Sequence, residues 1–519
     1  MTSVYEHLRA RTRPARVARV SPLTLSIVLL VVLRLPWLLA IIHRDEGLFG
    51  YEGFLLMQGG LPYVDVVDHH GLSLYVLYGI SYWLFGTSII PMRVLTLLLH
   101  VLMLIALYDI SKRWFGITVA QWTALLFALF SNLPVFEAPF ALTESLATPF
   151  AVVGVALYER YRADDAQPIA LYMLAWFLLA FATSIRFTLA FMVLMLAVVV
   201  VVDTLGDVRR TWLARVEALL WRGAIAAAIG ALVWGVIVLY LAARGALGAF
   251  GQILGETFLY GTQAAYVGVV MRVFLLQQGL PMFALSAVAM LALVLGFRHL
   301  QRGHYVLIWW TLVFAYVVTR PQMLGHYFVQ VLPVGAMLAA LGVIALIAFF
   351  EPFTRQRAYS VGGALVVVLG LFLYSAPLAI GQYPDMRPPT VAASVFSYAD
   401  SRSRADQHEL ARVVRQAMAS ARAENPAAQL YVYGNAPATY WLAEEFAPVR
   451  DTYAINNYAW VVHEHGDPPP FALARADDTA VVVLFDAYLR QPRNDVTYYV
   501  TTFYDFVARV GSATVYQRR

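Results

Sequence analysis

Residues 43–71 read HRDEGLFGYEGFLLMQGGLPYVDVVDHHG, and they begin where an apolar run that starts near residue 23 ends. That run has the length of a transmembrane helix, because the hydrocarbon core of a bilayer takes about 20 apolar residues to cross. The 29 residues of the quoted stretch hold five acidic side chains and three histidines. The stretch therefore predicts a polar segment, rich in ionisable groups, at a membrane surface.

The rest of the chain has the composition of a membrane protein. Of its 519 residues, 61% are hydrophobic and 13% are charged, whereas soluble domains carry about 25% charged residues. We expect a polytopic α-helical membrane protein with about 11 to 13 transmembrane helices. The predicted spans are 23–43, 90–111, 117–133, 138–158, 169–184, 187–203, 223–243, 273–297, 304–319, 328–350 and 359–380. The first is too long for the apolar core of a signal peptide, so we expect it to remain as a helix.

The positions of lysine and arginine orient these spans. With a cytoplasmic N-terminus, the inner segments hold 17 of these residues and the outer loops hold five, which is the bias of the positive-inside rule. This orientation predicts an integral protein of the plasma (inner) membrane, with the 44–89 loop and the C-terminal part outside the cytoplasm. Residues 72–86 are apolar but short. We expect them to form a juxtamembrane or re-entrant helix, because a full crossing would reverse every later loop.

The pattern changes after residue 381. The segment QYPDMRPPT is a proline-rich linker, and a helix with one apolar face should then end near Asn425 and Pro426. Strand patterns lie at 430–434, 480–485 and 513–518, and helical patterns at 437–446 and 496–509. We therefore predict two domains: a transmembrane catalytic domain over 1–381 and a small extracytoplasmic α/β domain over 382–519.

Several classes of function are excluded or disfavoured. The chain has no cysteine, so it can form neither disulfides nor thiolate metal sites. Its net charge of +5 is dispersed over short loops rather than gathered on one face, which argues against a nucleic-acid partner. The sequence contains no Walker A loop, GxGxxG, GxSxG or HExxH motif. It also lacks the Asp-x-Asp triplet with which many nucleotide-sugar transferases hold a metal.

What remains is a set of polar groups at the outer ends of the predicted spans. Their members are Asp45, Glu46, Asp65, Asp68, His69, His70, Thr143, Glu144, Arg186, Arg320, His326 and Tyr327. Ionisable groups at membrane depth are costly and tend to mark functional cavities. A solvated helix end is the simpler interpretation for Glu52, Asp109 and Glu256. Arg186 and Arg320 could be interfacial anchors, whose charged ends reach the water while their stems lie in the membrane. Arg34, midway along the first span, needs an internal partner.

In order, the chain presents DEGLFGYEGFLLMQGGLPYVD, DHHGLSLYVLYGISYWLFGTSIIPMR, LTES and HYFVQVLP. Over roughly residues 23–350 this order resembles the GT-C glycosyltransferases of the protein O-mannosyltransferase and lipid A aminoarabinose transferase superfamily. The resemblance implies an enzyme that moves a sugar from a polyprenyl-phosphate donor to a glycan, lipid or protein acceptor on the outer face of the membrane. The chain departs from the family at His70-Gly71-Leu72, where relatives often have prolines, and this departure affects the acceptor side.

The resemblance also assigns roles to residues. The aspartate after the first span acts at the acceptor, as general base or its orienter; this role falls to Asp45, with Glu46 beside it. The family's acidic position in its Thr-Asp/Glu segment falls on Glu144. The lipid phosphate meets a basic residue, most plausibly Arg186, with Arg320, His326 and Tyr327 as further candidates. The residues expected to support the acceptor side are Asp65, Asp68, His69, His70 and Glu144.

The chemistry agrees with these residue types. Displacing a lipid phosphate from an anomeric carbon takes a base for the attacking hydroxyl and positive charge at the leaving phosphate. In-line attack would invert the anomeric centre of the hexosyl or pentosyl group. Carboxylate and imidazole suit Mn²⁺ or Zn²⁺, so Asp45, Asp68, His69 and His70 could hold a divalent cation. Metal dependence stays open at this point.

Two other functions compete with the enzyme. A polytopic transporter or lipid flippase with an outer receptor domain would place its polar groups near the bilayer midplane, within broken and repeated helices. In this sequence the polar groups gather at one face, and no repeat is visible. A non-catalytic membrane anchor would not explain costly arginines and acids at membrane depth.

Overall fold

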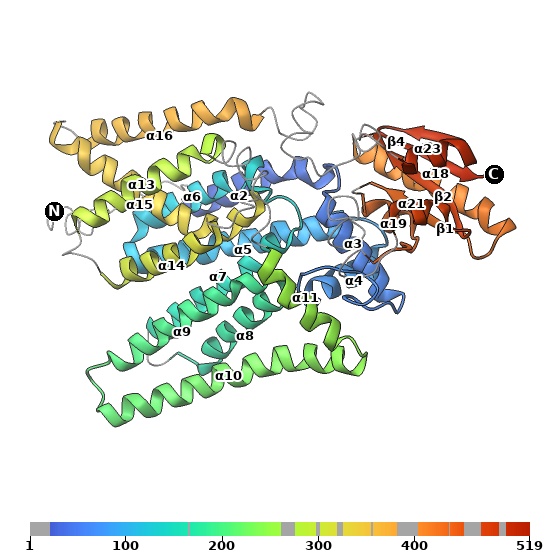
Figure 1. Cartoon of the computed structure of the whole chain (residues 1–519). Helices are drawn as coiled ribbons and strands as arrows, with labels where there is room; N and C mark the ends of the chain where they lie inside the picture. Colours follow the sequence, from blue (N-terminus) through green and yellow to red (C-terminus); the bar gives the residue numbers. More distant parts are fainter. Residues whose placement is uncertain are drawn as a thin grey trace.

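The computed structural model describes residues 21–163, 167–260, 276–296, 301–318, 325–353, 357–380, 403–434, 436–450, 469–486 and 495–519. Long helices form a bundle, and a small mixed domain lies at one end of it, beside α3 (Figure 1). The polytopic helical fold with a small C-terminal α/β part agrees with the prediction.

Each predicted span overlaps a helix of the bundle, although several helices begin or end some residues away from the predicted bounds. These helices are α2 (Pro22–Arg34), α5 (Ile90–Phe115), α6 (Ile117–Phe130), α7 (Thr143–Ala163), α8 (Ile169–Ile185), α9 (Ala190–Leu205), α10 (Trp212–Ala243), α13 (Leu280–Leu295), α14 (Arg302–Val318), α15 (Leu332–Phe350) and α16 (Arg357–Ile380). Among the described residues, six helices are long and apolar enough to cross a membrane, and four further apolar helices are shorter. Large apolar side chains such as Leu232, Leu239 and Val366 are exposed on their outer surfaces, as expected of helices surrounded by lipid.

Short elements join the long helices. They are the 3₁₀ turns η1 (Leu35–Leu39), η2 (Pro134–Phe136), η3 (Phe187–Leu189), η5 (Gly325–Gln330) and η6 (Glu351–Phe353), together with the helix α11 (Leu247–Tyr260). Within the bundle, α7 packs against α8 and α5, and α15 packs against α13 and α6. The turns η2, η3 and η5 lie at helix ends, and the residues that follow or precede them carry much of the polar cluster described below.

The polar stretch after the first span is not the loop that its acidic composition suggested. It contains α3 (Arg44–Met57), and residues 72–85 form α4 (Leu72–Phe85), the short helix that was expected there. The side chain of His43 accepts a hydrogen bond from the backbone N–H of Asp45, while Glu46 accepts one from the backbone N–H of His43. This reciprocal capping satisfies donors that a helix start leaves without partners. The sequence therefore encodes a helix whose first turn presents Asp45.

One side chain of α3 is placed differently from the prediction. Glu52 was interpreted as a solvated helix end, but its side chain is fully buried between α3 and the loop that carries Asp68. Tertiary packing of α3 against α4 explains the difference, because both broad faces of this short helix are covered.

The C-terminal part is a four-stranded sheet covered by helices. Its elements are α18 (Arg404–Glu424), β1 (Gln429–Tyr433), α19 (Ala438–Ala443), α21 (Pro470–Arg475), β2 (Thr479–Phe485), α23 (Asp495–Phe503), β3 (Tyr504–Val510) and β4 (Ala513–Arg518). The strand order is β1-β2-β4-β3, with β1 and β2 parallel and the other pairs antiparallel. The predicted helix over 496–509 was wrong in its second half. There the aromatic and β-branched residues of β3 pair with β4 through a turn at Gly511, whose φ is +57°.

Candidate active site

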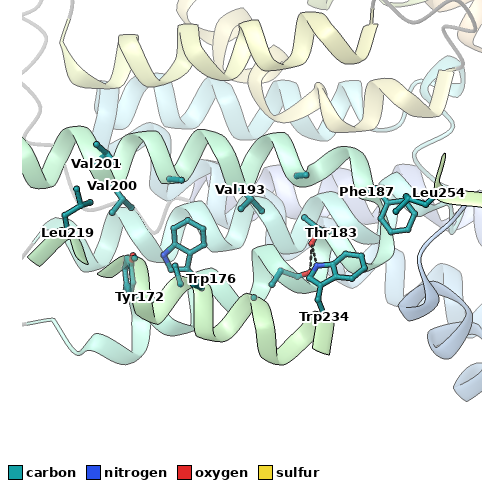
Figure 2. Close-up of a pocket in the computed structure, with 17 residues that line it drawn as sticks. Tyr172, Trp176, Thr183, Phe187, Val193, Val200, Val201, Leu219, Trp234 and Leu254 are labelled. Atoms are coloured by element: carbon teal, nitrogen blue, oxygen red, sulfur yellow. Dashed lines mark hydrogen bonds between the residues drawn. The ribbon is translucent and has the colours of Figure 1, made fainter. Parts of the chain in front are cut away.

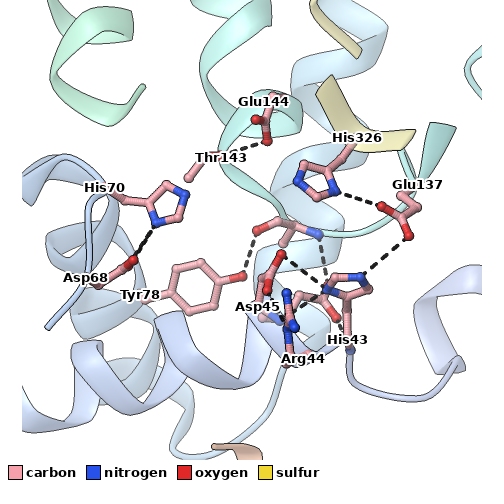
Figure 3. Close-up of polar contacts among 12 residues, drawn as sticks. His43, Arg44, Asp45, Asp68, His70, Tyr78, Glu137, Thr143, Glu144 and His326 are labelled. Carbon is pink, nitrogen blue, oxygen red and sulfur yellow. Dashed lines mark hydrogen bonds and ion pairs between the residues drawn. The ribbon is translucent and has the colours of Figure 1, made fainter. Parts of the chain in front are cut away.

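Asp45 stands at the start of α3, surrounded by positive or titratable groups (Figure 3). Its carboxylate lies 3.1 Å from Nε of Arg44 and 3.9 Å from Nδ1 of His43, and 14% of its side chain is exposed. Burial alone would raise the pKa of Asp45, but the Arg44 guanidinium, together with the imidazoles of His43 and His326, outweighs it and holds the pKa below its ordinary value. Asp45 is therefore a carboxylate at neutral pH, and it is accessible to a ligand.

Glu46, the second residue of the predicted catalytic pair, is placed quite differently. Its side chain is fully buried and forms an ion pair with Arg93, with Nε of Arg93 lying 2.9 Å from Oε1. The same oxygen accepts the backbone N–H of Ala141 at 2.8 Å. Arg93 also donates to the backbone carbonyls of Trp37, Leu38, Ala40 and Ile41. The geometry assigns Glu46 to holding the start of α3 in place, not to contact with a substrate.

Arg34 finds its internal partners in the loop between α6 and α7. Its guanidinium donates to the carbonyl of Ser131 at 3.1 Å and to that of Ala138, and lies 2.9 Å from Nδ1 of His100. This buried arginine therefore ties the first span to the segment that carries Glu137.

Glu137 is a site residue that the sequence reasoning missed. It follows η2 with φ at +52°, a left-handed conformation that is uncommon outside glycine. Its Oε2 lies 2.7 Å from Nδ1 of His326, and its Oε1 lies 3.7 Å from Nε2 of His43. Although burial raises the pKa of Glu137, the hydrogen bond from His326 and the nearby imidazole of His43 lower it to about 2. The only sequence signal was a single acid in an apolar stretch, NLPVFEAPF.

His326 is thereby held between several acids. Burial would lower the pKa of His326, but the negative charges of Glu144, Glu137 and Asp45 together raise it. The imidazolium form of His326 is therefore more stable here than that of a free imidazole.

Glu144 and Arg186 form a second ion pair in the same region. Nη2 of Arg186 lies 2.9 Å from Oε1 of Glu144, and Thr143 donates its hydroxyl to the other Glu144 oxygen at 2.7 Å. The Arg186 guanidinium packs over the ring of Tyr327, 5.2 Å from its centroid. Nε of Arg186 is buried and has no hydrogen-bond partner among the described residues. Arg186, Tyr327 and Glu144, which were predicted separately, are thus brought together.

Asp68, His69 and His70 form the third part of the cluster. Asp68 lies 2.8 Å from Nδ1 of His70, and it accepts the Tyr75 hydroxyl at 2.8 Å. One ligand atom from each of the three residues lies within 4.8 Å of the others, and no other such group of three occurs within the described ranges. Asp45 is not a member of this group, although the sequence suggested it as a ligand.

Two predicted site residues are not part of this cluster as the structure describes it. Asp65 is exposed and accepts the backbone N–H of Leu61 at 2.7 Å, which closes a turn. Arg320 lies outside the described residues. The cluster therefore consists of groups from α3, the 68–70 loop, the 137–144 segment, the end of α8 and η5 (Figure 3).

An apolar groove runs along the bundle between α8, α9 and α10 (Figure 2). Its volume is about 670 Å³. Trp176, Val193 and Trp234 line its middle, and Phe187, the residue after Arg186, stands at one end with Leu254. The indole N–H of Trp234 donates to Thr183 at 3.1 Å. The groove is therefore almost wholly apolar, and one end of it is lined by the residue that follows Arg186 in the chain.

The bundle of long apolar helices, the carboxylate at the start of α3 and the appended α/β domain together give the chain the architecture of the GT-C fold. The comparisons agree with this class. The chain resembles ArnT from Cupriavidus metallidurans bound to undecaprenyl phosphate, with 14% identity, 94% of this chain and 97% of that chain covered, and a TM-score of 0.59. The Archaeoglobus fulgidus oligosaccharyltransferase tethered with an acceptor peptide matches with 13% identity, coverages of 95% and 74%, and a TM-score of 0.53.

Two further comparisons concern sequence. Residues 69–234 match the family model described as dolichyl-phosphate-mannose-protein mannosyltransferase. No curated protein matches the chain. The chain has the GT-C fold, as the order of its motifs predicted.

Proposed function

We propose that this protein is an inverting glycosyltransferase of the membrane, which moves a sugar from a polyprenyl-phosphate donor to an acceptor at the face where α3 begins. The observation that carries the proposal is the gathering of a partly exposed carboxylate, Asp45, with the cationic groups His326 and Arg186 in one cluster. Displacement at an anomeric carbon takes these two kinds of group on opposite sides of the reacting bond. The fold supports the same reaction class.

In the proposed reaction, the acceptor hydroxyl attacks the anomeric carbon while the bond from that carbon to the phosphate oxygen breaks. The hydroxyl proton passes to Asp45, and the electron pair of the broken bond stays on the phosphate. The low pKa of Asp45 makes it a weak base. A weak base is sufficient when glycosyl transfer has an oxocarbenium-like transition state, since the hydroxyl becomes acidic as its bond to carbon forms.

The leaving phosphate would be stabilised by Arg186 and His326. Arg186 offers a buried N–H that has no partner among the described residues, and Tyr327 and Glu144 fix the plane of its guanidinium. Arginine suits phosphate because its planar set of donors matches the phosphate oxygens. Glu144 accordingly acts on the phosphate side by positioning Arg186. Glu46 acts at the other side of the reacting bond, because it holds in place the helix α3 that carries Asp45.

The groove between α8, α9 and α10 would hold the polyprenyl chain of the donor. Its apolar lining suits isoprene units, and Phe187 at its end is the chain neighbour of Arg186, the residue proposed to bind the lipid phosphate. ArnT, whose structure holds undecaprenyl phosphate, and the archaeal AglB, whose structure holds dolichol phosphate, share the fold. These ligands support a polyprenyl phosphate as the carrier of the hexosyl or pentosyl group.

A divalent cation fits the group formed by Asp68, His69 and His70. A carboxylate and two imidazoles are donors that suit Mn²⁺ or Zn²⁺. When bound there, the cation would supply positive charge close to the acceptor side of the cluster. Two hydrogen bonds hold the Asp68 carboxylate in position in this group. The hydroxyl of Tyr75 and the backbone N–H of His69 both donate to it.

The orientation inferred from the arginines completes the proposal. It places the cluster and the C-terminal domain on the extracytoplasmic side, where glycan, lipid and protein acceptors of the cell envelope are found. The uneven distribution of lysine and arginine between the two sides supports this orientation.

The test is transfer by the purified full-length protein in lipid nanodiscs, with a panel of synthetic polyprenyl-phosphate hexoses and pentoses. We expect Asp45→Asn to lower kcat by about 100-fold or more, the scale of a lost general base. The matched control is Asp505→Asn, an exposed aspartate of β3, which should keep full activity. Full transfer by Asp45→Asn would overturn the proposal, as would movement of the donor across the bilayer without a new glycosidic bond.

A further inference from the structure

The C-terminal domain lies beside α3, the helix that begins at Arg44 and carries Asp45 (Figure 1). The helix α19 lies against the glycines of α3. A Cβ on Gly47 would come within 2.7 Å of the Cβ of Ala438, and a Cβ on Gly50 within 2.5 Å of the ring of Trp441. Such distances are far shorter than carbon–carbon contact distances of about 3.5–4.0 Å. The two glycines, one turn apart, therefore make a flat face that fits α19 and would fit no larger side chain.

A second contact lies just before the helix. The side-chain amide of Gln407, on α18, accepts the backbone N–H of Ile42 at 2.9 Å and donates to the carbonyl of the same residue at 3.1 Å. Both Gln407 and Ile42 are buried. One side chain from the C-terminal domain thus satisfies both backbone groups of the residue that precedes the helix cap, His43.

Further hydrogen bonds from the same domain hold the rest of the segment. The backbone N–H of Ala447 donates to the hydroxyl of Tyr51 at 2.9 Å. The carbonyl of Arg450 accepts the backbone N–H of Val67 at 2.9 Å, next to Asp68. Because these contacts reach both α3 and the 61–70 loop, the domain borders two of the three parts of the cluster.

From these contacts we infer that the C-terminal domain is a structural part of the catalytic centre, and that Gln407 is a positioning residue for Asp45. Gln407 acts through the backbone: it fixes Ile42, and this sets where α3 begins and where the Asp45 carboxylate points. The inference rests on the proposed role of Asp45. A displacement of a reacting group by about 1 Å can cost about 100-fold in rate, so a bond to the residue before the cap can control the reaction without contacting a substrate.

The experiment combines kinetics with hydrogen–deuterium exchange on the full-length protein. In Gln407→Ala we expect kcat to fall by about tenfold or more, with the donor KM within about twofold, and faster exchange in peptides that cover residues 40–50. Gln407→Glu keeps an acceptor for the Ile42 N–H and should recover part of the loss. Arg412→Ala, on the exposed face of the same helix, is the control and should change neither readout.

A compensating pair tests the contact with α19. Gly50→Ala should lower kcat by driving a methyl group into Trp441, and Trp441→Leu in the same chain should restore part of it by making room. If Gln407→Ala and Gly50→Ala leave kcat and exchange at residues 40–50 unchanged in folded protein, the inference is wrong. If exchange rises but Asp45→Asn retains full activity, the proposed function fails, whereas the structural link between the domain and α3 stands.

Discussion

The carboxylate of Glu137 lies 2.7 Å from Nδ1 of His326, and 189 positions separate the two residues in the sequence. The contact joins the segment after η2 to the turn η5, and through the other Glu137 oxygen it extends to His43, the cap of α3. A left-handed backbone at Glu137 aims its carboxylate between the two rings. The pair therefore links the start of α3 to the cationic side of the cluster.

A pH dependence follows from His326. Its pKa is raised above the ordinary 6.5, because the acids Glu144, Glu137 and Asp45 that face it outweigh the effect of burial. A raised pKa means that the cation is present at low pH and is lost as the pH rises through that value. We expect kcat/KM for the donor to fall along an alkaline limb above pH 6.5. This limb should be absent in His326→Gln, and an identical pH–rate profile in that variant would contradict the assignment.

Glu137→Gln should shift the alkaline limb of the pH dependence of kcat/KM. Removing the negative charge lowers the pKa of His326, so the cation is lost at a lower pH than in the wild type. The expected result is a limb shifted toward acid, with kcat/KM at neutral pH reduced by about tenfold. Asp505→Asn serves as the control because the carboxylate of Asp505 is exposed and pairs with Arg519, away from the cluster. An unshifted limb would show that Glu137 does not tune His326.

Arg93→Met should destabilise the whole bundle. The substitution leaves the Glu46 carboxylate buried without its cation and removes donors to the carbonyls that precede α3. Breaking one partner of a buried ion pair costs about 3–5 kcal/mol, whereas exposed pairs contribute about 0–1 kcal/mol. Arg412→Met, which breaks an exposed pair with Glu409, is the matched control. Thermal unfolding in detergent measures both, and equal melting temperatures would refute the anchoring role.

The sequence predicted the long apolar helices well, because the length and hydropathy of a segment are local properties. It failed for α3, whose Gly47, Gly50 and Gly53 lower helix propensity. Those glycines are explained only by what packs on them: Ala438 and Trp441 from the C-terminal domain, and Tyr78 from α4.

The site was predicted in part for the same reason. Asp45, Glu144, Arg186 and His326 could be found as polar groups at helix ends, since position along a span is visible in the sequence. The separate tasks of Asp45 and Glu46 could not, because they depend on Arg93, 47 residues away from Glu46. Burial of a single acid, as at Glu52, is likewise set by tertiary packing rather than by local pattern.

The metal content of the purified protein tests the metal site proposed at Asp68, His69 and His70. We expect the purified protein to take up about one Mn²⁺ or Zn²⁺ per chain, measured by elemental analysis after dialysis. Asp68→Asn should lower metal affinity by about 10-fold or more, because a neutral amide is a poorer ligand than a carboxylate. Asp109→Asn, whose carboxylate pairs with Arg113 and Arg160, should bind metal as the wild type does. Equal metal content in Asp68→Asn and wild type would exclude this site.

The groove gives a prediction that separates chain binding from chemistry. Gly230 lines the groove on α10, and nothing lies within 4 Å of the Cβ it would carry, so Gly230→Leu should fold and fill the space. We expect the KM for a long-chain polyprenyl-phosphate donor to rise about tenfold, whereas the KM for a short-chain analogue stays unchanged, because only the long chain buries its apolar surface there. Gly235→Leu, on the same helix with equally open space but outside the groove lining, is the control. If both donors lose affinity equally, or neither does, the polyprenyl chain lies elsewhere.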